Sequence, residues 1–346
     1  MVAVAPLSAP KYRLSLRLSL IPETYREELP TSSFVRPFSQ PTGIHYPDRL
    51  VKTRPPFSWV GGKRQLLPVL RDWVPPKIDI YGEPCVGGGA LFFNCVFNER
   101  RLVEGGLAYL SDRNADLIND YQFLRDDPKA LMKELSRPEY ANNELAYWKV
   151  LLFHLRTPVE RAARLHYLQK TSHTGLYRET KEGFDVPFGH RANPKIMDKR
   201  RIMALHQALQ GVAVFHGGFE DVLKKLPKTC PKGKTVFVYF DPPYIPLPKK
   251  SQAGRRVTSF TSYTKDGFTL QDQRKLAQVF RICHERGFHI MASNSNSPLV
   301  SKLYAGFNIQ TILATRKSSC KPATRGPIPE TVIMNYRPED GFRLVS

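Results

Sequence analysis

Short apolar runs alternate with longer segments of helical periodicity along much of the chain. Strand-like apolar runs occupy residues 78–84, 107–112, 212–217, 235–241, 288–294 and 308–313. An amphipathic helical pattern over residues 90–101 follows the first run, and a second helical segment over residues 114–124 follows the next run. Such alternation is typical of an α/β fold, and we predict a Rossmann-like sheet.

A different pattern interrupts the alternation from about residue 128 to 205. Four basic helical segments are expected there, at residues 130–135, 145–156, 158–170 and 195–209. Strand-like runs resume after them. We therefore predict a catalytic domain made of residues 57–127 and 206–346, into which residues 128–205 are inserted as a mainly helical subdomain.

The first 56 residues are basic and rich in proline. Lys11, Arg13 and Arg17 lie in a stretch of 22 residues without an acid, a composition that resembles a transit peptide. We favour a poorly ordered basic extension, because chain termini commonly lack order. No apolar run approaches the roughly 20 residues that cross a bilayer, so no membrane span is expected.

The charge of the chain points to a polyanionic partner. Lys and Arg number 52 against 31 Asp and Glu, a formal net charge of +21, which favours nucleic acid. Five widely spaced cysteines form no CxxC pair and no zinc-like cluster with histidine, so neither a metal site nor a disulfide framework is predicted. We expect reduced thiols in a cytoplasmic protein of a prokaryotic or virus-infected cell.

A glycine loop follows the first predicted strand, at the edge where open α/β sheets bind ligands. In "YGEPCVGGGALFF", Gly87 to Gly89 let the backbone approach a ligand, and the next helix offers free N–H groups. A plain strand-to-helix turn would also use such glycines. Asp112 ends the next strand, where a carboxylate accepts hydrogen bonds from ribose hydroxyls. The two features together predict a nucleoside-containing cofactor.

A second strand end, "VFVYFDPPYIP", carries an acid, two prolines and a tyrosine. Pro242 and Pro243 fix φ and remove two backbone donors, which frees carbonyl groups to face a ligand. Asp241 and one such carbonyl can accept both hydrogens of an exocyclic amino group, while the ring of Tyr244 stacks on a planar base. The stretch predicts a site for an amine on a heterocycle; an Asp-Pro-Pro turn that merely closes a strand is the alternative.

Six motifs resemble the DNA adenine methyltransferase (Dam) family in order and spacing. They are "FSWVGGKRQLLP" (57–68), "EPCVGGG" (83–89), "LSDRNADLIN" (110–119), "FDPPY" (240–244), "FTSYTKDGFTLQDQRKLA" (260–277) and "SNSNS" (293–297). The resemblance runs from about Phe57 to Tyr336 and is specific because independent motifs agree. "GGK" alone suggests a phosphate loop, but the GxxxxGK[ST] pattern and a preceding strand are missing, so an ATPase is excluded.

The resemblance implies a site-specific enzyme that transfers methyl from S-adenosylmethionine to the exocyclic N6 of a flipped adenine in a short duplex DNA site. By similarity, the expected cofactor contacts are Trp59, Lys63, Glu83, Pro84, Gly87, Gly89, Asp112, Phe219 and Asp241. Catalysis is expected from Asp241, Pro242, Pro243 and Tyr244. Hydrogen bonds from the amine to Asp241 and to the Pro242 carbonyl would favour a more tetrahedral nitrogen, in line with the sulfonium methyl. Cys85 resembles the nucleophile of cytosine C5 enzymes, but it sits in the glycine loop.

The inserted region is expected to read DNA. Between Arg156 and Arg201 there are 11 Lys and Arg against 5 Asp and Glu, and residues 173–191 resemble the base-reading hairpin of the family. Arg178 aligns with an arginine that contacts a guanine edge, a contact that suits a bidentate guanidinium. Phosphate contacts are expected from loops at 249–256 and 316–325. The remaining expected DNA-binding residues are Tyr177, His190, Arg191, Lys249, Lys250, Arg255 and Arg256. The alternative is a basic face exposed to solvent, but the resemblance to the hairpin favours DNA binding.

Three positions depart from the family pattern. Cys85 replaces the phenylalanine usual after Glu-Pro, and Gly218 stands where an acid near the cofactor adenine is common, so weaker cofactor binding is expected. Ser58 stands where GATC-specific members carry a DNA-contacting lysine. The target sequence is therefore open, with a GATC-like site as the candidate.

Two alternative functions stay open from the sequence. One is methyl transfer to RNA adenine or to a protein glutamine amide, since an acid or amide before Pro-Pro-Tyr presents any planar amine. The other is a catalytically inactive DNA-binding relative, against which the intact "DPPY" argues. Double-stranded DNA is the expected partner of a monomer or weak dimer, with a cognate restriction endonuclease as a further candidate and neither metal nor membrane involved.

Overall fold

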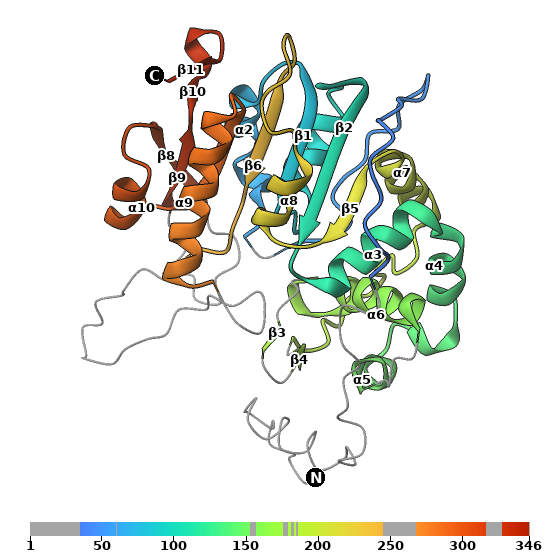
Figure 1. Cartoon of the computed structure of the whole chain (residues 1–346). Helices are drawn as coiled ribbons and strands as arrows, with labels where there is room; N and C mark the ends of the chain where they lie inside the picture. Colours follow the sequence, from blue (N-terminus) through green and yellow to red (C-terminus); the bar gives the residue numbers. More distant parts are fainter. Residues whose placement is uncertain are drawn as a thin grey trace, which may run out of the picture.

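A seven-stranded sheet forms the centre of the computed structural model, which describes residues 35–59, 61–152, 157–175, 179–180, 183–184, 186–244, 268–315 and 327–345 (Figure 1). The strand order is β5-β2-β1-β6-β7-β9-β8. The bounds are β1 Ile78–Pro84, β2 Leu102–Asp112, β5 Ala213–His216, β6 Val236–Phe240, β7 His289–Ser295, β8 Asn308–Thr315 and β9 Pro327–Met334. Neighbours from β5 to β7 are parallel, whereas β9 is antiparallel to both β7 and β8. The predicted Rossmann-like α/β fold is confirmed.

The central strand β6 shows why its sequence is apolar throughout. All five residues are buried. Val236, Val238 and Phe240 pack with α8 (Phe219–Lys225) and α9 (Leu270–Glu285), which cover the face toward the viewer in Figure 1. Phe237 and Tyr239 belong to the core of the opposite face. A strand buried on both faces has no polar side, which explains the uninterrupted run.

The helix after β1 differs from the amphipathic one expected over residues 90–101. A short helical turn passes into a π-helical segment, Phe92–Phe97, in which every residue except Asn94 is buried. The chain then turns at Arg100, whose φ is 53°. The segment is therefore shorter and more buried than expected. We attribute this to the three phenylalanine side chains of the segment, all of which lie in the hydrophobic core.

Most of the helical region lies below the carboxyl ends of β2 and β5 in Figure 1, whereas its last helix, α7, lies higher, beside β5. Its helices are α3 Ala115–Asp126, α4 Pro128–Leu135, α5 Glu144–Leu152, α6 Pro158–Thr171 and α7 Lys199–Leu209, and its short hairpin pairs β3 Glu179–Thr180 with β4 Gly183–Phe184. Thr157 and Glu160 close the start of α6 as a capping box. Side chains of this region share one hydrophobic core with the sheet. A separate subdomain at 128–205 therefore stays a prediction.

Part of the expected N-terminal extension packs on the sheet, while residues 1–34 lie outside the described residues. Ile44 is 1% exposed, and its backbone exchanges hydrogen bonds with Gly105 and Gly106 of β2. The Thr42 amide donates to the carbonyl of Gly211. Residues 42–44 thus lie between β2 and the turn before β5.

The sequence pattern did not predict β9, because "PIPETVIM" carries two prolines. The pairing shows why they are tolerated. β7 pairs only with the part of β9 from Glu330 onward, whereas Pro327 and Pro329 pair with β8 alone. Proline has no N–H group to donate, so it is tolerated where no second strand would need that hydrogen bond. The strand matters for function because it brings Glu330 toward the end of β6.

The remaining elements surround this sheet. They are η3 Lys63–Gln65, α2 Leu67–Trp73, η5 Pro138–Tyr140, η6 His173–Gly175, α10 Pro298–Leu303, η8 Pro338–Asp340 and the hairpin of β10 Tyr336–Arg337 with β11 Arg343–Leu344. Within the described ranges, no helix combines the length and apolar character needed to cross a membrane.

Candidate active site

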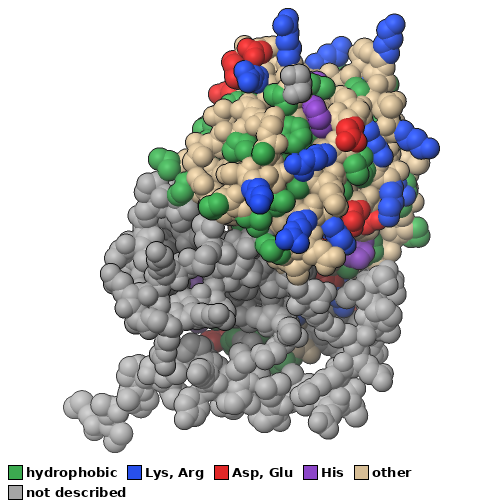
Figure 2. All heavy atoms as spheres, turned by 60° about the vertical axis from the view of Figure 1, so that its left-hand side comes forward, with side chains coloured by type: hydrophobic (Ala, Val, Ile, Leu, Met, Phe, Trp, Pro, Cys, Tyr) green, Lys and Arg blue, Asp and Glu red, His purple; other side chains and the backbone are tan. Residues whose placement is uncertain are grey.

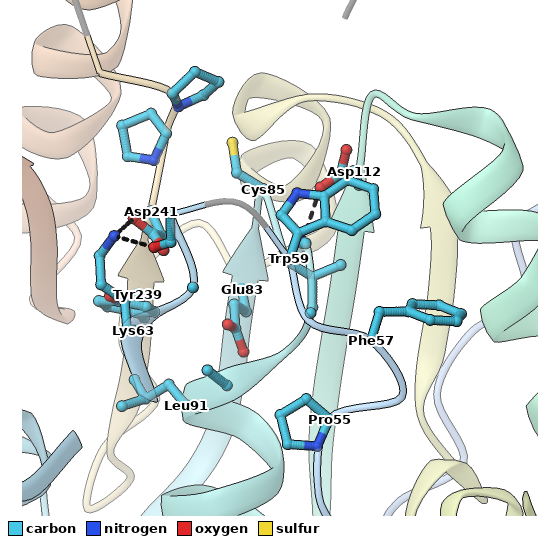
Figure 3. Close-up of a pocket in the computed structure, with 18 of the residues that line it drawn as sticks. Pro55, Phe57, Trp59, Lys63, Glu83, Cys85, Leu91, Asp112, Tyr239 and Asp241 are labelled. Atoms are coloured by element: carbon cyan, nitrogen blue, oxygen red, sulfur yellow. Dashed lines mark hydrogen bonds and ion pairs between the residues drawn. The ribbon is translucent and has the colours of Figure 1, made fainter. Parts of the chain in front are cut away.

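A cavity of about 440 Å³ opens at the carboxyl ends of β1, β2 and β6 (Figure 3). Among the expected cofactor and catalytic residues, it is lined by Trp59, Lys63, Glu83, Gly87, Asp112, Phe219, Asp241, Pro242, Pro243 and Tyr244. Pro84 and Gly89 lie beside it, at the end of β1 and in the glycine loop. The fold thus brings the two stretches that the sequence singled out into one cavity.

The glycine loop depends on its lack of side chains. Gly87 and Gly89 have φ of 47° and 67°, in the left-handed region that glycine adopts without strain. A Cβ on Gly87 would lie 2.7 Å from Cδ1 of Trp59, and one on Gly89 would lie 2.9 Å from the hydroxyl of Tyr121. The loop therefore packs tightly between the indole ring and the helix behind it, and only glycine fits at these two positions.

Asp112 ties the glycine loop to the end of β2. Its Oδ2 accepts a hydrogen bond from the Gly87 amide at 3.0 Å, and its Oδ1 accepts one from the Asn114 amide at 2.9 Å. Burial raises the pKa of Asp112, while these backbone donors oppose the rise. A carboxylate has about four acceptor positions, so capacity remains for a ligand hydroxyl.

A cluster of four side chains surrounds the end of β6. The Lys63 ammonium lies 2.8 Å from Oδ1 of Asp241 and 3.8 Å from Oε2 of Glu330. Tyr244 donates its hydroxyl to the same Glu330 oxygen at 2.8 Å, and the ammonium lies 4.7 Å from the centre of its ring. We call Lys63, Asp241, Tyr244 and Glu330 the Lys63 cluster. Its contacts hold the Asp241 carboxylate and the Tyr244 ring, the two groups that the sequence predicts to bind an amine.

The charge of Asp241 results from two opposed effects. Burial raises the pKa of Asp241 to about 6, the nearby Lys63 ammonium lowers it, and Glu330 adds to the rise. Lys63 itself is only 3% exposed. A buried carboxylate needs such a partner to stay ionised near neutral pH. By favouring the ionised carboxylate, Lys63 keeps Asp241 able to accept hydrogen bonds.

Among the described residues, no lysine or arginine forms an ion pair with the buried carboxyl group of Glu83. It is 2% exposed and accepts a hydrogen bond from the Tyr81 hydroxyl at 2.8 Å. Burial raises the pKa of Glu83 to about 8; the Tyr81 bond lowers it, and Asp241 raises it further. A positively charged ligand group would restore ionisation, so this part of the cavity suits a cation.

Comparison with known proteins identifies the kind of enzyme that this cavity belongs to. A family model described as D12 class N6 adenine-specific DNA methyltransferase matches residues 59–318. The chain belongs to this family.

Three relatives agree with the family model. The Type II methyltransferase M1.LlaDCHI of Lactococcus lactis subsp. cremoris is 38% identical over 295 residues, which cover 83% of this chain and 96% of that protein. M.MjaIII of Methanocaldococcus jannaschii, also a Type II methyltransferase, is 36% identical over 83% of this chain and 100% of that protein. A DNA adenine methylase of Vibrio cholerae is 29% identical over 82% and 96%. The resemblance to DNA adenine methyltransferases is thereby confirmed.

Two residues in or beside the cavity of this methyltransferase were not singled out by the sequence: Arg113 lines the cavity, and Glu330 lies beside it in the Lys63 cluster. Glu330 gave no signal because β9 was not predicted. Arg113 follows Asp112 directly, and its guanidinium lies 5.6 Å from the ring centre of Phe219. A Cβ on Gly218 would lie 2.9 Å from Nε of Arg113. The lack of a side chain at Gly218 therefore leaves room for this arginine.

The thiol of Cys85 is protonated, which makes it a poor nucleophile. Its φ of 62° is unusual for a residue with a side chain, and burial raises the pKa of its thiol well above the ordinary value. The thiol stays protonated, whereas nucleophilic attack requires the thiolate. This agrees with N6 methylation, which needs no covalent intermediate.

The expected DNA-binding residues fall into two groups. Tyr177, Arg178 and the stretches 249–256 and 316–325 lie outside the described residues. The ring centre of His190 lies 4.8 Å from that of Phe188. Arg191 is exposed and donates a hydrogen bond to the carbonyl of Lys170 at 3.3 Å. His190 and Arg191 therefore lie outside the catalytic cavity, beside α6.

Proposed function

We propose that this enzyme transfers a methyl group from S-adenosylmethionine to N6 of an adenine flipped out of a duplex DNA site. The observation that carries the proposal is the meeting, in one cavity, of the glycine loop and Asp112 with Asp241 and Tyr244. One half suits a nucleoside with a cationic tail, and the other half suits an aromatic amine.

The residues present fit S-adenosylmethionine. The cavity volume lies within the roughly 300–1,000 Å³ range of small-molecule sites. Asp112 would accept from the ribose, Trp59 and Phe219 would border flat groups, and Glu83 would face the amino group of the methionine portion. This last assignment rests on the raised pKa of Glu83, since a bound ammonium supplies the missing cation. The cofactor contributes an electrophilic methyl group on a sulfonium.

Asp241 and the Pro242 carbonyl would hold the adenine amine. Two acceptors match the two hydrogens of the amine and favour a nitrogen with a localised lone pair. The nitrogen gains the methyl group and must lose one proton. Asp241, with a pKa of about 6, is a suitable acceptor for that proton near neutral pH.

Tyr244 would stack on the flipped base. Its ring is oriented by the hydrogen bond from its hydroxyl to Glu330 and by the Lys63 ammonium on its face. A ring that is already fixed loses little freedom when a base binds. The Lys63 cluster therefore supports both the amine acceptor and the stacking surface.

A GATC-like duplex remains our candidate target, read by Arg178. Two relatives carry Type II methyltransferase names, which supports a role in a restriction-modification pair with a cognate endonuclease as partner. Monomeric or weakly dimeric state and cytoplasmic location stay predictions.

The test is methyl transfer from labelled S-adenosylmethionine to duplex DNA, RNA and protein in parallel. We expect label in DNA adenine alone. Sequencing DNA from expressing cells with a method that reads modified adenines then gives the site. Label in RNA or protein without label in DNA would overturn the proposal, and Asp241→Ala serves as the inactive control.

A further inference from the structure

A second cavity, of about 270 Å³, adjoins the catalytic cavity. Both cavities are lined by Pro55, Phe57, Ser58 and Arg64, so one short segment separates them. The charged side chains of the second cavity are Arg54, Arg64, Lys170, Arg191, Lys195 and Arg201, against the single acid Asp198. We call it the basic cavity.

Among the described residues, acids compensate only part of the charge of the basic cavity: Asp198 acts on Lys170 and Arg201, and Asp120 acts on Lys170. Among the described residues, none of its six cationic side chains takes part in an ion pair with an acid. Asp198 accepts a hydrogen bond from the Arg201 amide and caps the start of α7. Burial lowers the pKa of Lys170 to about 8, and the neighbouring Arg201 contributes to the decrease. Six cationic side chains around one cavity with a single lining acid remain in electrostatic excess, which is unfavourable without an anion and indicates an anionic ligand.

The floor of the basic cavity has unused hydrogen-bonding capacity. Gln169 is 4% exposed, yet within the described part of the chain neither its amide nitrogen nor its oxygen has a partner. Nε of Arg201 is likewise without a partner there. Lys170 and Arg201 donate to the carbonyls of Pro56 and Pro55. Two donor groups, the Gln169 amide nitrogen and Nε of Arg201, therefore remain unused beside this cavity.

Scattered surface charge does not account for this arrangement. On the face shown in Figure 2, Lys and Arg side chains are spread among hydrophobic ones and do not gather at one place. In the basic cavity, by contrast, half-buried Lys170 and Arg201 lie at the floor, and exposed Arg54, Arg64, Arg191 and Lys195 form the rim.

We propose that the basic cavity binds a backbone phosphate of the DNA strand that carries the target adenine. The assignment of the strand rests on the proposed function, since the cavity shares a wall with the site for the flipped base. Phosphate oxygens accept strong hydrogen bonds from guanidinium, ammonium and amide donors. The cofactor is an unsuitable occupant, because its sulfonium and ammonium groups would be repelled.

Duplex binding at several chloride concentrations tests this assignment. The variants are Lys170→Gln, Arg201→Gln and Lys195→Gln, and the matched control is Lys232→Gln, an exposed lysine in the loop before β6, at the opposite end of the sheet. We expect Lys170→Gln and Arg201→Gln to weaken binding about tenfold or more. The slope of log Kd against log salt should fall by about 0.9 for each phosphate that the variant protein no longer binds. Lys232→Gln should change neither quantity.

Folding and ligand source are controlled separately. Arg201→Gln removes the bond to Pro55, so circular dichroism accompanies each variant, and the rim variant Lys195→Gln tests the site without touching that bond. Wild-type Kd and salt slope in folded Lys170→Gln and Lys195→Gln would overturn the proposal. Saturable binding of inorganic phosphate that these variants abolish, with duplex binding unchanged, would also overturn it and assign a free anion instead.

The outcome is independent of catalysis. If the wild-type protein binds duplex DNA through the basic cavity but methylates no adenine, the proposed function and the strand assignment fail, while the basic cavity remains a site for a DNA phosphate. If the wild-type protein methylates adenine while the variants bind DNA normally, the proposed function stands and the phosphate site in the basic cavity fails.

Discussion

The Lys63 ammonium lies 2.8 Å from Oδ1 of Asp241, and this ion pair joins η3 to the end of β6. Figure 3 shows this pair on one side of the cavity, with Glu83 between it and Trp59. The pair connects the expected cofactor side to the expected adenine side. Its main physical effect is on charge, because Lys63 opposes the rise that burial imposes on the pKa of Asp241.

Replacing Lys63 should therefore move the pH dependence of catalysis. Methyl transfer needs ionised Asp241, so kcat/KM should fall below a pKa of about 6 in the wild type. In Lys63→Met the pKa of Asp241 rises further, and the acid limb should shift to higher pH. Lys63→Arg retains the positive charge and should keep the limb near its original position. An unchanged pH profile in Lys63→Met would show that the ion pair does not control Asp241.

Asp241→Ala should abolish methyl transfer and leave folding and DNA binding intact. The carboxylate that this change removes acts on the adenine amine and binds no phosphate in this mechanism. Methylation assays, duplex binding and thermal melting of the same preparation check the three parts. Asp340→Ala, which removes an exposed acid near the C-terminus, is the matched control. Turnover at the wild-type rate in Asp241→Ala would refute the assigned site.

Asp112→Ala should mainly weaken cofactor binding, by about 1 to 3 kcal/mol for the hydrogen bonds to a polar ligand that it removes. The change also removes the bonds from the Gly87 and Asn114 amides, which adds a loosened glycine loop to this effect. Asp112→Asn retains an acceptor oxygen and should be the milder change. Calorimetric titration with S-adenosylmethionine measures both, and equal affinities of wild type and Asp112→Ala would reject the assignment.

Glu83 should make the cofactor-free protein less stable as pH rises. Its pKa is about 8 in the folded protein and about 4.5 in an unfolded chain, so the folded state holds the proton more tightly. The stabilisation is complete below the unfolded pKa and is lost as pH rises through the folded pKa. Glu83→Gln should thus show a smaller fall in Tm between pH 5 and 8.5, by scanning calorimetry. Parallel Tm curves for the two proteins would place the carboxyl pKa near its ordinary value.

Base reading and phosphate holding should be separable in the DNA-binding stretches. Arg178→Ala should cost about 1 to 3 kcal/mol against the cognate site and leave non-specific binding nearly unchanged. Lys250→Ala and Arg255→Ala should instead weaken binding to all sequences and lower the salt slope by about 0.9 each. Titrations across salt and single-base variants distinguish the two behaviours. If Arg178→Ala behaves like the other two, Arg178 is a phosphate contact only.

Local pattern determined much of this protein. The parallel strands were predicted because they are mostly apolar, and β6 is the clearest case, since a strand buried on both faces requires an uninterrupted apolar run. Asp112 and Asp241 were found as candidates because they stand directly at strand ends, where parallel topology gathers ligand-binding groups. The glycine loop was visible because left-handed backbone and close packing exclude other residues at Gly87 and Gly89.

Only the tertiary structure decided which distant groups meet. Glu330 belongs to the Lys63 cluster because β9 places it there. The prolines of β9 kept this strand from being predicted, and they are tolerated because its first residues pair with β8 alone. The basic cavity is assembled from residues 54–64, 169–175 and 191–201, which have no shared periodicity. Charge counts show that cations are in excess, but they do not show which of them are buried together. Long-range packing sets those distances, and the pKa values of Asp241, Glu83 and Lys170 follow from the burial and neighbours that packing creates.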